Sequence, residues 1–562
     1  MRIPTLILVF AFAAEGQPTA APQAARIEGL VRSANGEAIP RASLRLEGPE
    51  EDERPELTAL SDDEGRFRFD HVPPGRDYFL TARRPGFVDA RYGARSATGP
   101  GTPLTMERGA VVNDIVIAMT PQGVIRGRVA SPSGDPLMGS TVMALQPVYE
   151  RGERRISMAA RAVTNDQGEY RIANLAPGEY YIGAFDRRVP NVAPGRPPEG
   201  YAVTYHPNGT DVRDAAPLRI TGGAEFRSID VRLRQTRVYA IRGKVVDASG
   251  APANGTLLAV QRVDDPIADG VVTNARSGGA LQPTAAPNAT FEFRGLTPGT
   301  YFIQTLPGVR LNRDVTPPLV ARVEVTITDQ DVSGAVLLAG AGASVSGSVT
   351  MESGGIGALF PQGSLLAVGL EEVAPLALNT PDEEQISTDG TFRIAGAALT
   401  RHYLRVTGLP DNLYLKSARF NGADVTHAPI DLSSGAGGVL EIVLSPKAAG
   451  ITGIVRDADG RALGAAQVTL WPAMPDPGSA TRGIRAATSD QNGAFEFHGL
   501  APGDYFLAAW EDADPGLLEY HPFLMLLKSP AAALTLGENA HTALEAPLIR
   551  LEKIRAAESQ LP

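Results

Sequence analysis

The sequence predicts an all-β protein, organised as a tandem array of five β-sandwiches of about seven strands each. Three observations lead to this prediction: a high content of turn-forming residues, short segments of alternating polarity, and the repetition of the same strand signatures. Gly and Pro contribute 60 and 45 of the 562 residues, too many for long helices, which exclude both. Hydrophobic residues still make up 43%, so the chain can bury cores between short elements.

The first signature is a strand in which an apolar residue, a Gly and a Val alternate, as in Ile125-Gly127-Val129. Because side chains alternate across a strand, these three positions share one face. A second Gly follows seven residues after the first and predicts a turn with positive φ. The five pairs of glycines are Gly29/Gly36, Gly127/Gly134, Gly243/Gly250, Gly347/Gly354 and Gly453/Gly460.

The second signature is a turn rich in Asp, Asn and Gly, followed by a strand that reads apolar, charged, apolar. Its apolar side faces a core and its charged side faces water. We expect the first aromatic of this strand to lie across the Gly of the first signature, since a Gly between apolar neighbours leaves room for a bulky group. The apolar pairs are Phe67/Phe69, Tyr170/Ile172, Phe291/Phe293, Phe392/Ile394 and Phe495/Phe497.

The third signature is Leu-x-Pro-Gly-x-Tyr, most regular at 175–180, and it predicts a type II turn with reversed φ at the Gly. The fourth copy departs from it, with Leu399-Thr400-Arg401-His402-Tyr403. A last strand is expected to close each copy at 114–119, 229–233, 335–338, 440–444 and 547–551. Residues 516–528 are apolar enough for short helical segments on either side of Pro522.

The opening glycines are 98, 116, 104 and 106 residues apart, a spacing typical of sandwich domains of about 100 residues. The joints between copies are short, so we expect a semi-rigid, monomeric rod. The predicted boundaries are a signal peptide and disordered mature N-terminus at 1–22, sandwiches at 23–120, 121–235, 236–340, 341–446 (divergent) and 447–553, and a tail at 554–562.

Together the three signatures resemble the carboxypeptidase regulatory-like domain, a transthyretin-like, Ig-like sandwich that occurs in tandem in exported bacterial proteins. The resemblance extends over residues 26–551 and is weakest at 344–444. It implies the fold and export. It implies no catalytic residue, because these domains carry none that could be transferred to this sequence.

The amino-terminal segment MRIPTLILVFAFAAEGQ has a positive residue, an apolar run and a small-residue cleavage pattern, as in a secretory signal. We expect the protein to be exported and to be periplasmic, on the cell surface or secreted, with no transmembrane segment beyond the signal peptide. The net charge of −11 disfavours nucleic acid as a partner. The absence of Cys excludes disulfides and thiolate sites.

Two kinds of aromatic feature are candidate ligand sites. The tripeptides Tyr205-His206-Pro207 and Tyr520-His521-Pro522 lie at matching distances before the last strand, and Tyr92 lies at nearly the same distance. An exposed Tyr beside His could stack on a sugar or anchor a partner, whereas the alternative is a Tyr that fills the open end of a sandwich. Trp471 and Trp510 could form a glycan platform at a sheet edge, or fill a core.

No enzymatic constellation is apparent in the sequence. None of the seven His residues is followed three positions later by Glu or Asp, so the zinc motif of metallocarboxypeptidases is missing. No Gly-x-Ser-x-Gly nucleophile motif occurs. Asp-rich turns such as Asp62-Asp63-Glu64 offer too few oxygens for calcium and are expected to be simple turns. We expect no catalytic residue, metal or cofactor.

These observations favour a non-enzymatic scaffold, an adhesion or protein-interaction array of the cell envelope. The alternative is a carbohydrate-binding array that uses loop or edge aromatics. A more remote alternative is an accessory module of an envelope peptidase or transport system. The expected partner is therefore an envelope protein or a glycan.

Overall fold

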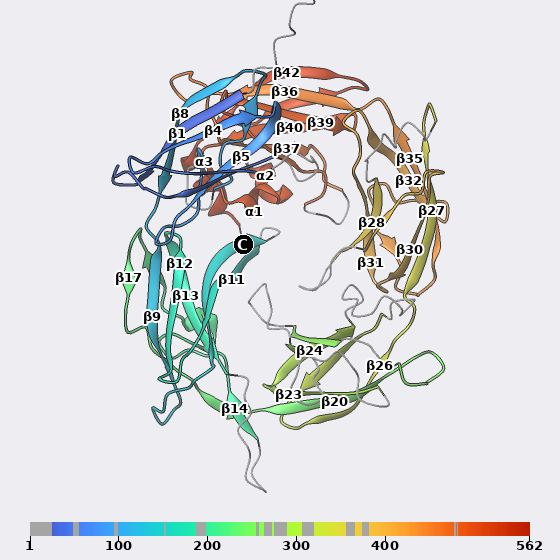
Figure 1. Cartoon of the computed structure of the whole chain (residues 1–562). Coiled ribbons are helices and arrows are strands. Elements are labelled where there is room, and N and C mark those ends of the chain that lie inside the picture. The colour runs from blue at the N-terminus through green and yellow to red at the C-terminus, as the bar shows by residue number, and fades with distance from the viewer. Residues whose placement is uncertain are drawn as a thin grey trace, which may run out of the picture.

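The structure is a computed structural model of the whole chain, and it is built almost entirely of β-strands (Figure 1). The predicted signal peptide at 1–22 lies outside the described residues. The structure describes residues 25–48, 56–94, 99–150, 153–186, 198–253, 258–263, 273–274, 289–305, 320–355, 366–373, 382–476, 479 and 481–561.

The described strands form five similar pairs of sheets, which we call the first to fifth units. In the first unit the sheets run β4-β1-β8 and β3-β2-β5-β6, with β7 also paired to β5. These strands are β1 (Ala25–Ser33), β2 (Ser43–Glu47), β3 (Leu57–Leu60), β4 (Arg66–Val72), β5 (Gly75–Arg83), β6 (Ala90–Arg91), β7 (Leu104–Met106) and β8 (Val111–Met119).

The second unit has the sheets β12-β9-β17, with β18 also on β9, and β11-β10-β13-β15, with β16 also on β13. A ribbon of β14 and β19 follows. The strands are β9 (Gly123–Ala130), β10 (Thr141–Glu150), β11 (Glu153–Val163), β12 (Glu169–Leu175), β13 (Gly178–Phe185), β14 (Glu199–Tyr201), β15 (Thr204–Tyr205), β16 (Leu218–Ile220), β17 (Glu225–Phe226), β18 (Val231–Arg232) and β19 (Gln235–Arg237), with a 3-10 turn η1 (Val212–Asp214).

The third unit pairs β23-β20-β26 with β22-β21-β24-β25, and the fourth pairs β30-β27-β35-β32-β33 with β29-β28-β31-β34. The third contains β20 (Tyr239–Val246), β21 (Leu258–Arg262), β22 (Thr273–Asn274), β23 (Thr290–Leu296), β24 (Gly299–Thr305), β25 (Arg322–Ile327) and β26 (Val332–Leu338). The fourth contains β27 (Ala343–Met351), β28 (Ala367–Glu372), β29 (Asp382–Gln385), β30 (Thr391–Ala397), β31 (Arg401–Thr407), β32 (Tyr414–Phe420), β33 (Ala423–Asp424), β34 (Ile430–Asp431) and β35 (Gly438–Ser445).

The fifth unit pairs β39-β36-β42 with β38-β37-β40-β41, and it also carries helices. Its strands are β36 (Ala449–Val455), β37 (Gln467–Pro472), β38 (Arg485–Thr488), β39 (Ala494–Leu500), β40 (Gly503–Trp510), β41 (Ala532–Leu536), β42 (His541–Ala546) and β43 (Leu548–Ile549), and its helices are α1 (Pro515–Leu518), α2 (His521–Leu526) and α3 (Leu551–Glu558). The last long strand is therefore β42, not the predicted 547–551, and part of the predicted tail at 554–562 is helical.

The opening glycine and the aromatic of the second signature face each other in all five units, as predicted. The two residues are register partners, for example Gly29 with Phe67 and Gly347 with Phe392. A Cβ added at Gly347 would come within 2.5 Å of the Phe392 ring atom Cζ, and it would also collide with the Leu440 carbonyl oxygen. The corresponding carbonyl obstructs a Cβ in every unit. The glycine is required because an aromatic ring and a parallel strand occupy the space of a side chain.

The third signature forms a corner that the Tyr hydroxyl ties together. Tyr180 donates a hydrogen bond to the Ala176 carbonyl at 3.0 Å, and Tyr78, Tyr301 and Tyr505 make the same backward bond to the backbone. The type II turn was not found: Gly178 has no positive φ, and the Tyr180 ring packs over it. The second glycine of the first signature, in contrast, has the predicted positive φ in every unit, for example 95° at Gly134.

In the fourth unit His402, rather than Tyr403, takes the place of the corner tyrosine. Its Nε2 lies 2.7 Å from the carbonyl oxygen of Ala398, four residues earlier, as in the tyrosine corners. The His402 side chain is buried, and burial lowers its pKa. Its Nδ1 has no hydrogen-bond partner among the described residues. The divergent copy thus preserves the backward bond with a different donor.

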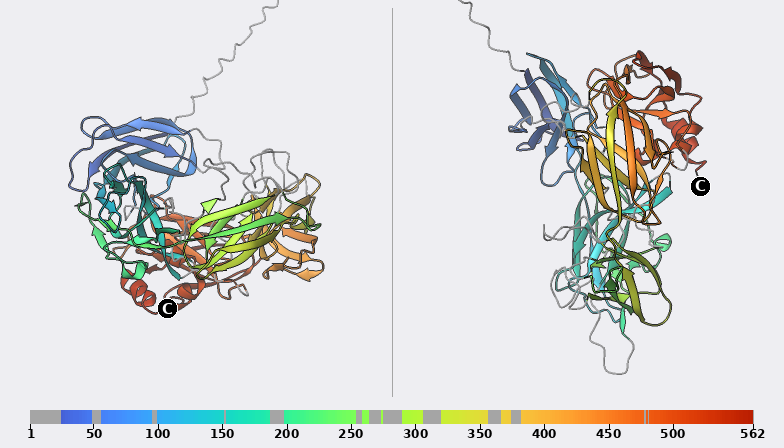
Figure 2. Two further views of the ribbon diagram at one scale, coloured as in Figure 1. Left: turned by 90° about the horizontal axis from the view of Figure 1, so that it is seen from below. Right: turned by 90° about the vertical axis from the view of Figure 1, so that its right-hand side faces the viewer.

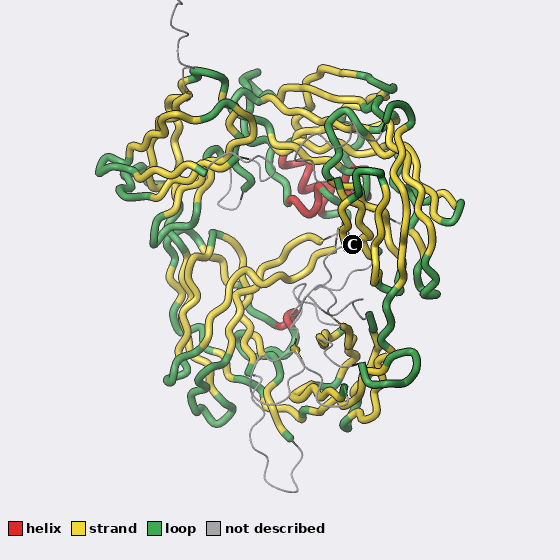
Figure 3. Tube along the Cα trace, turned by 45° about the vertical axis from the view of Figure 1, so that its right-hand side comes forward, coloured by secondary structure: helices red, strands yellow, loops and turns green. Residues whose placement is uncertain are grey.

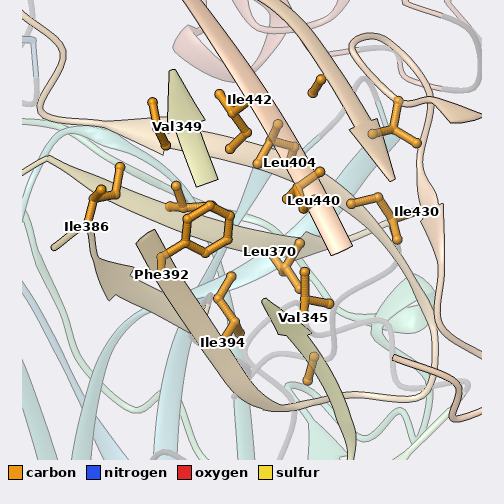
Figure 4. Close-up of a cluster of buried hydrophobic side chains, with 14 of the residues drawn as sticks. Val345, Val349, Leu370, Ile386, Phe392, Ile394, Leu404, Ile430, Leu440 and Ile442 are labelled. Atoms are coloured by element: carbon orange, nitrogen blue, oxygen red, sulfur yellow. The ribbon is translucent and has the colours of Figure 1, made fainter. Parts of the chain in front are cut away.

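Each unit has its own hydrophobic core between its two sheets. The core of the fourth unit shows the common plan, with Phe392, Ile394, Val345 and Leu440 from one sheet packed against Leu370 and Leu404 from the other (Figure 4). Such separate cores agree with a sandwich array, in which each copy stands on its own packing.

The units are arranged in a ring, not in the predicted rod (Figure 1). Figure 2 shows that the units lie at different heights, so the ring is not flat. The first unit contacts the fifth: Thr105 exchanges two backbone-to-side-chain hydrogen bonds with Gln491, at 3.0 and 2.9 Å. The prediction of a rod failed because it considered only units that are neighbours in sequence. The short joints turn the chain, and the first unit meets the fifth.

Candidate functional site

The tyrosine loops predicted as one site have different structures in the three units. Tyr205 lies in β15, buried, with its ring over Gly183 on the outer face of the sheet. The matching position in the first unit is Arg91, not Tyr92, because Arg91 pairs with Thr81 as Tyr205 pairs with Gly183. Tyr92 is half-buried and packs against the core of the first unit. The same loop therefore does not present a tyrosine to solvent in each unit.

His206 is a structural residue at the edge of the second unit. Its backbone amide donates to the Ile182 carbonyl, as that of Tyr92 donates to Leu80, and its Nδ1 lies 2.8 Å from the Asp230 carbonyl oxygen. The side chain is half-buried. His206 therefore connects the loop to the last strand of its own sandwich.

The second tripeptide, Tyr520-His521-Pro522, starts helix α2 instead of forming a strand. Tyr520 is the residue before the helix, and Pro522 lies in its first turn, where its missing N–H costs nothing. His521 is buried, and its Nε2 lies 2.9 Å from the Pro472 carbonyl oxygen. This bond attaches α2 to the end of β37, next to Trp471.

Both tryptophans are buried, with 0% of Trp471 and 1% of Trp510 exposed, so they fill a core, the second of the two alternatives, and form no platform at a sheet edge. They lie on the outer face of β37 and β40, which in a simple sandwich would face water. Here helices α1, α2 and α3 cover that face. We call the resulting group the tryptophan cluster; its buried members are Trp471, Ala508, Trp510, Leu517, Leu518, Phe523, Leu524, Leu527, Ile549, Ile554 and Ala557.

The aromatic rings of this cluster are stacked at an angle along the sheet. The ring centres of Trp471 and Trp510 are 6.2 Å apart, as are those of Trp510 and Phe523. Trp510 Nε1 donates to Thr469 Oγ1 at 3.0 Å, whereas the buried Trp471 Nε1 has no partner among the described residues. The structure thus brings four of the seven candidate residues together, Trp471, Trp510, Tyr520 and His521, as a second core and not as an open surface.

The tryptophan cluster is also where the second unit reaches across the ring. The long hairpin of β10 and β11 extends toward the helices, which lie on the inner side of the ring (Figures 1 and 3). Tyr149, near the end of β10, packs against the cluster and interacts electrostatically with the side chain of Glu558 in α3. Burial and this carboxylate raise the pKa of the Tyr149 hydroxyl. At Gly516 a Cβ would collide with the Tyr149 carbonyl oxygen.

Sequence reasoning missed Tyr149 and Gln491, the residues that close the ring. Tyr149 belongs to no repeated signature, and Gln491 lies in the turn of the second signature in the fifth copy, but both act on units far away in the sequence. A length signal existed for Tyr149, since the second copy is the longest, at 116 residues between opening glycines. Nothing in that length indicates which distant unit the longer hairpin contacts.

The Asp-rich turns serve the backbone. Asp62 Oδ1 accepts hydrogen bonds from the amides of Glu64 and Arg66, and Asp457 and Asp490 bind the amides two and four residues later in the same way. Among the described residues, no group of His, Asp and Glu could hold a metal ion. In that part of the chain, no helix is both long and apolar enough to cross a bilayer.

Comparison with solved structures finds several pilins, among other proteins, at low similarity. A streptococcal ancillary pilin is 14% identical, covering 56% of this chain and 98% of the pilin, with a TM-score of 0.21. The TIE protein of Bacillus anthracis is 10% identical, covering 76% and 74%, with a TM-score of 0.15. GBS52, the minor pilin of Streptococcus agalactiae, is 11% identical, covering 38% and 97%, with a TM-score of 0.21.

No curated protein matches the sequence. The family model of the carboxypeptidase regulatory-like domain matches two segments, residues 26–117 and 124–221. These segments include the whole of the Gly–aromatic pairing and the tyrosine corner of the first two units. The chain therefore carries carboxypeptidase regulatory-like domains in tandem, at residues 26–117 and 124–221.

Proposed function

We propose that this chain is an exported, non-enzymatic scaffold that binds envelope proteins from a closed ring of β-sandwiches. The observation that carries the proposal is the fate of the residues that could have formed a site. Trp471, Trp510 and His521 are buried in a second core, Tyr205 is buried on a sheet face, and His206 is bonded to its own unit. The residues that were the best candidates for ligand binding are therefore used for packing.

The ring gives such a scaffold a physical advantage over a string of loosely linked sandwiches. Contacts at Gln491 and Tyr149 restrain the first, second and fifth units relative to one another. Surfaces held at set distances let weak contacts combine, because binding at one surface raises the effective concentration at the next. A flexible chain loses part of that gain to the entropy of ordering its linkers.

Export is supported by the sequence of the first residues, in which a short apolar run follows Arg2. Domains of the family to which the first two units belong occur in exported bacterial proteins, which agrees with export of this chain. We propose the cell envelope as the site of action, with the chain facing the periplasm or the outside.

The experiment is to express the full chain in the cells that produce it, fractionate them, and cross-link the intact envelope. We expect the mature chain outside the cytoplasm, in cross-linked species heavier than the 59.1 kDa of one chain. The Tyr149→Ala variant, with an opened ring, should form less of these species, and Val163→Ala, an exposed residue of the same hairpin, should not differ from wild type. A cytoplasmic chain would contradict the proposal. So would retention on an insoluble polysaccharide that Tyr92→Ala or Tyr520→Ala abolishes.

A further inference from the structure

In the first, second, third and fifth units, the last strand that pairs with the opening strand lies at an edge of its sheet. In the fourth unit β35 is not an edge, because β32 pairs with it along its length, in antiparallel register. Ser417 lies opposite Val443 and Arg419 opposite Glu441. The chain therefore contains its own example of an added strand on a regulatory-like sandwich.

Strand β32 is held by backbone pairing and by a polar anchor at one end. Asn421 N donates to the Val439 carbonyl at 2.9 Å, and the Asn421 side chain accepts from Val439 N, also at 2.9 Å. At the other end Lys416 forms an ion pair with Glu352, which also accepts a bond from Ser445 Oγ at 2.6 Å. These two groups hold the pKa of the Glu352 carboxyl at about 2.

Strand β26 of the third unit has the same position as β35 but lacks this cover among the described strands. Gly243 is paired with Ala335 as Gly347 is with Leu440, so Val336 corresponds to Glu441 and Leu338 to Val443. Ala339 N donates inward to the Val246 carbonyl, and the corresponding Leu444 carbonyl also bonds inward, to Glu352 N. Because backbone direction alternates along a strand, the N–H and C=O groups of Val336 and Leu338 point to the open edge.

The side chains at these two positions distinguish the third unit from the second and fifth. In the second unit they are Asp230 and Arg232, and His206 is bonded to the Asp230 carbonyl. In the fifth they are Glu545 and Pro547, a charge and a residue with no N–H to offer. Charge and proline are the usual means by which proteins protect an edge strand from pairing.

The described residues of the third unit provide no such protection. Val336 and Leu338 are 45% and 65% exposed, and no charged residue occurs in β26. An exposed apolar edge with free backbone groups is the geometry that strand addition uses, with main-chain bonds for affinity and alternate side chains for specificity. The corresponding Val443 is half-buried with β32 in place.

We propose that the β26 edge of the third unit accepts an extended segment of a partner polypeptide as an antiparallel strand, with apolar side chains opposite Val336 and Leu338. The proposal rests on the function proposed above and names its binding surface. The model for the occupant is β32, with its two outward residues changed from Ser417 and Arg419 to apolar ones to match the third unit.

The test uses the full chain and a synthetic peptide with the sequence of residues 413–422, carrying Ser417→Val and Arg419→Val. We expect saturable binding by fluorescence anisotropy and slower hydrogen exchange at the amides of Val336 and Leu338. The chain variant Val336→Lys/Leu338→Lys should weaken binding by about tenfold or more. Val163→Lys, which places the same charge on another exposed strand residue, should leave binding unchanged. The peptide with its original Ser and Arg should bind more weakly than the substituted peptide.

A peptide that protects no amide in 332–338, or that binds the double lysine variant equally well, would overturn the proposal. If the double variant does not keep the wild-type unfolding midpoint, Leu338→Lys alone serves, since that side chain is largely exposed. Dimerisation of the chain without peptide, abolished by the same lysines, would also overturn it by assigning the edge to a second copy. A chain that binds the peptide but remains in the cytoplasm would contradict the proposed function alone.

Discussion

The second and fourth units share an interior and differ at their corners and edges. In both, the opening glycine lies beneath an aromatic ring and a parallel strand, Gly127 under Tyr170 and Gly347 under Phe392. The corner donor is Tyr180 in one and His402 in the other. The second unit reaches across the ring through Tyr149, whereas the fourth covers its own edge with β32. The common packing therefore defines the sandwich, and the surroundings of each sandwich define its role.

The largest effect is expected from filling the shared glycine position. Gly127→Ala and Gly347→Ala should each destabilise their own unit by about 1–3 kcal/mol, because the added Cβ meets a carbonyl oxygen and a ring that packing holds in place. Hydrogen exchange of the amides in β9 and β27 measures the loss in each unit separately.

Gly355→Ala is the matched control, since a Cβ there meets nothing within 4 Å and the residue lies in the same unit as Gly347. Its effect should stay within about 0.5 kcal/mol of zero. Equal protection in Gly347→Ala and Gly355→Ala would show that the ring over the glycine does not constrain the fold.

Removing the corner bond should have a smaller effect. Tyr180→Phe keeps the ring and loses only the bond to Ala176, so we expect a loss of about 0.5–1.5 kcal/mol in the second unit, measured by exchange of the β13 amides. In the fourth unit, His402→Phe should destabilise as well, and His402→Tyr should be tolerated best. If His402→Phe were as stable as wild type, the histidine would not be a substitute for the tyrosine.

The corner also predicts a pH dependence confined to the fourth unit. Burial lowers the pKa of His402 below its ordinary value near 6.5, although the Ala398 carbonyl and Glu372 oppose this effect and Arg322 adds to it. The folded state thus binds fewer protons than the unfolded state, so the stability present above about pH 6.5 is lost as the pH falls. After correction for the intrinsic exchange rate, hydrogen exchange of the β31 amides should become faster toward pH 5. The size of this change should be that expected from the titration of a single group.

His402→Tyr provides the control for this titration, because it retains a donor without an ionisable nitrogen in this pH range. A pH dependence of the same size in His402→Tyr would assign the effect to other groups. Tyr180 in the second unit should show no counterpart between these pH values, since burial raises its pKa further above them.

The smallest effect on unfolding, but a visible change of shape, is expected from Tyr149→Ala. The variant removes the contact between the hairpin of the second unit and the tryptophan cluster without entering either sandwich core. The radius of gyration from small-angle X-ray scattering should rise, and the melting of each unit should change little. An unchanged radius of gyration would mean that Gln491 and the joints suffice to close the ring, and Gln491→Ala in the same background would then test them.

Much of the interior could be predicted from sequence because it depends on local repeats. The pairing of Gly29 with Phe67, and its four counterparts, follows from period-two alternation and from the absence of a side chain at one position. The positive φ at Gly134 follows from the steric cost that any other residue would meet there. The prediction of a type II turn at Gly178 was wrong, since this glycine has no positive φ and β13 begins at it.

The candidate site could not be predicted in the same way. Trp471 and Trp510 lie on the sheet face that faces solvent in a plain sandwich, and only the three C-terminal helices convert that face into a core. Tyr92 seemed equivalent to Tyr205, but a shift of one residue places Arg91 there. A one-residue shift reverses the face of a strand residue, so a loop alignment from spacing alone cannot place a side chain.

The amino-acid sequence alone determined the repeating module: its alternating strands and the glycine beneath each aromatic. These features depend on residues within one copy, where steric fit and local periodicity leave few options. Only the tertiary structure decided that the copies close into a ring, that the tryptophans are covered, and that one apolar edge remains open while another is filled. Ring closure depends on contacts between residues hundreds of positions apart, such as Thr105 with Gln491, for which the sequence carries no periodic signal. The cover of the tryptophans and of one sheet edge comes from segments outside the repeated signatures, namely the three helices and β32.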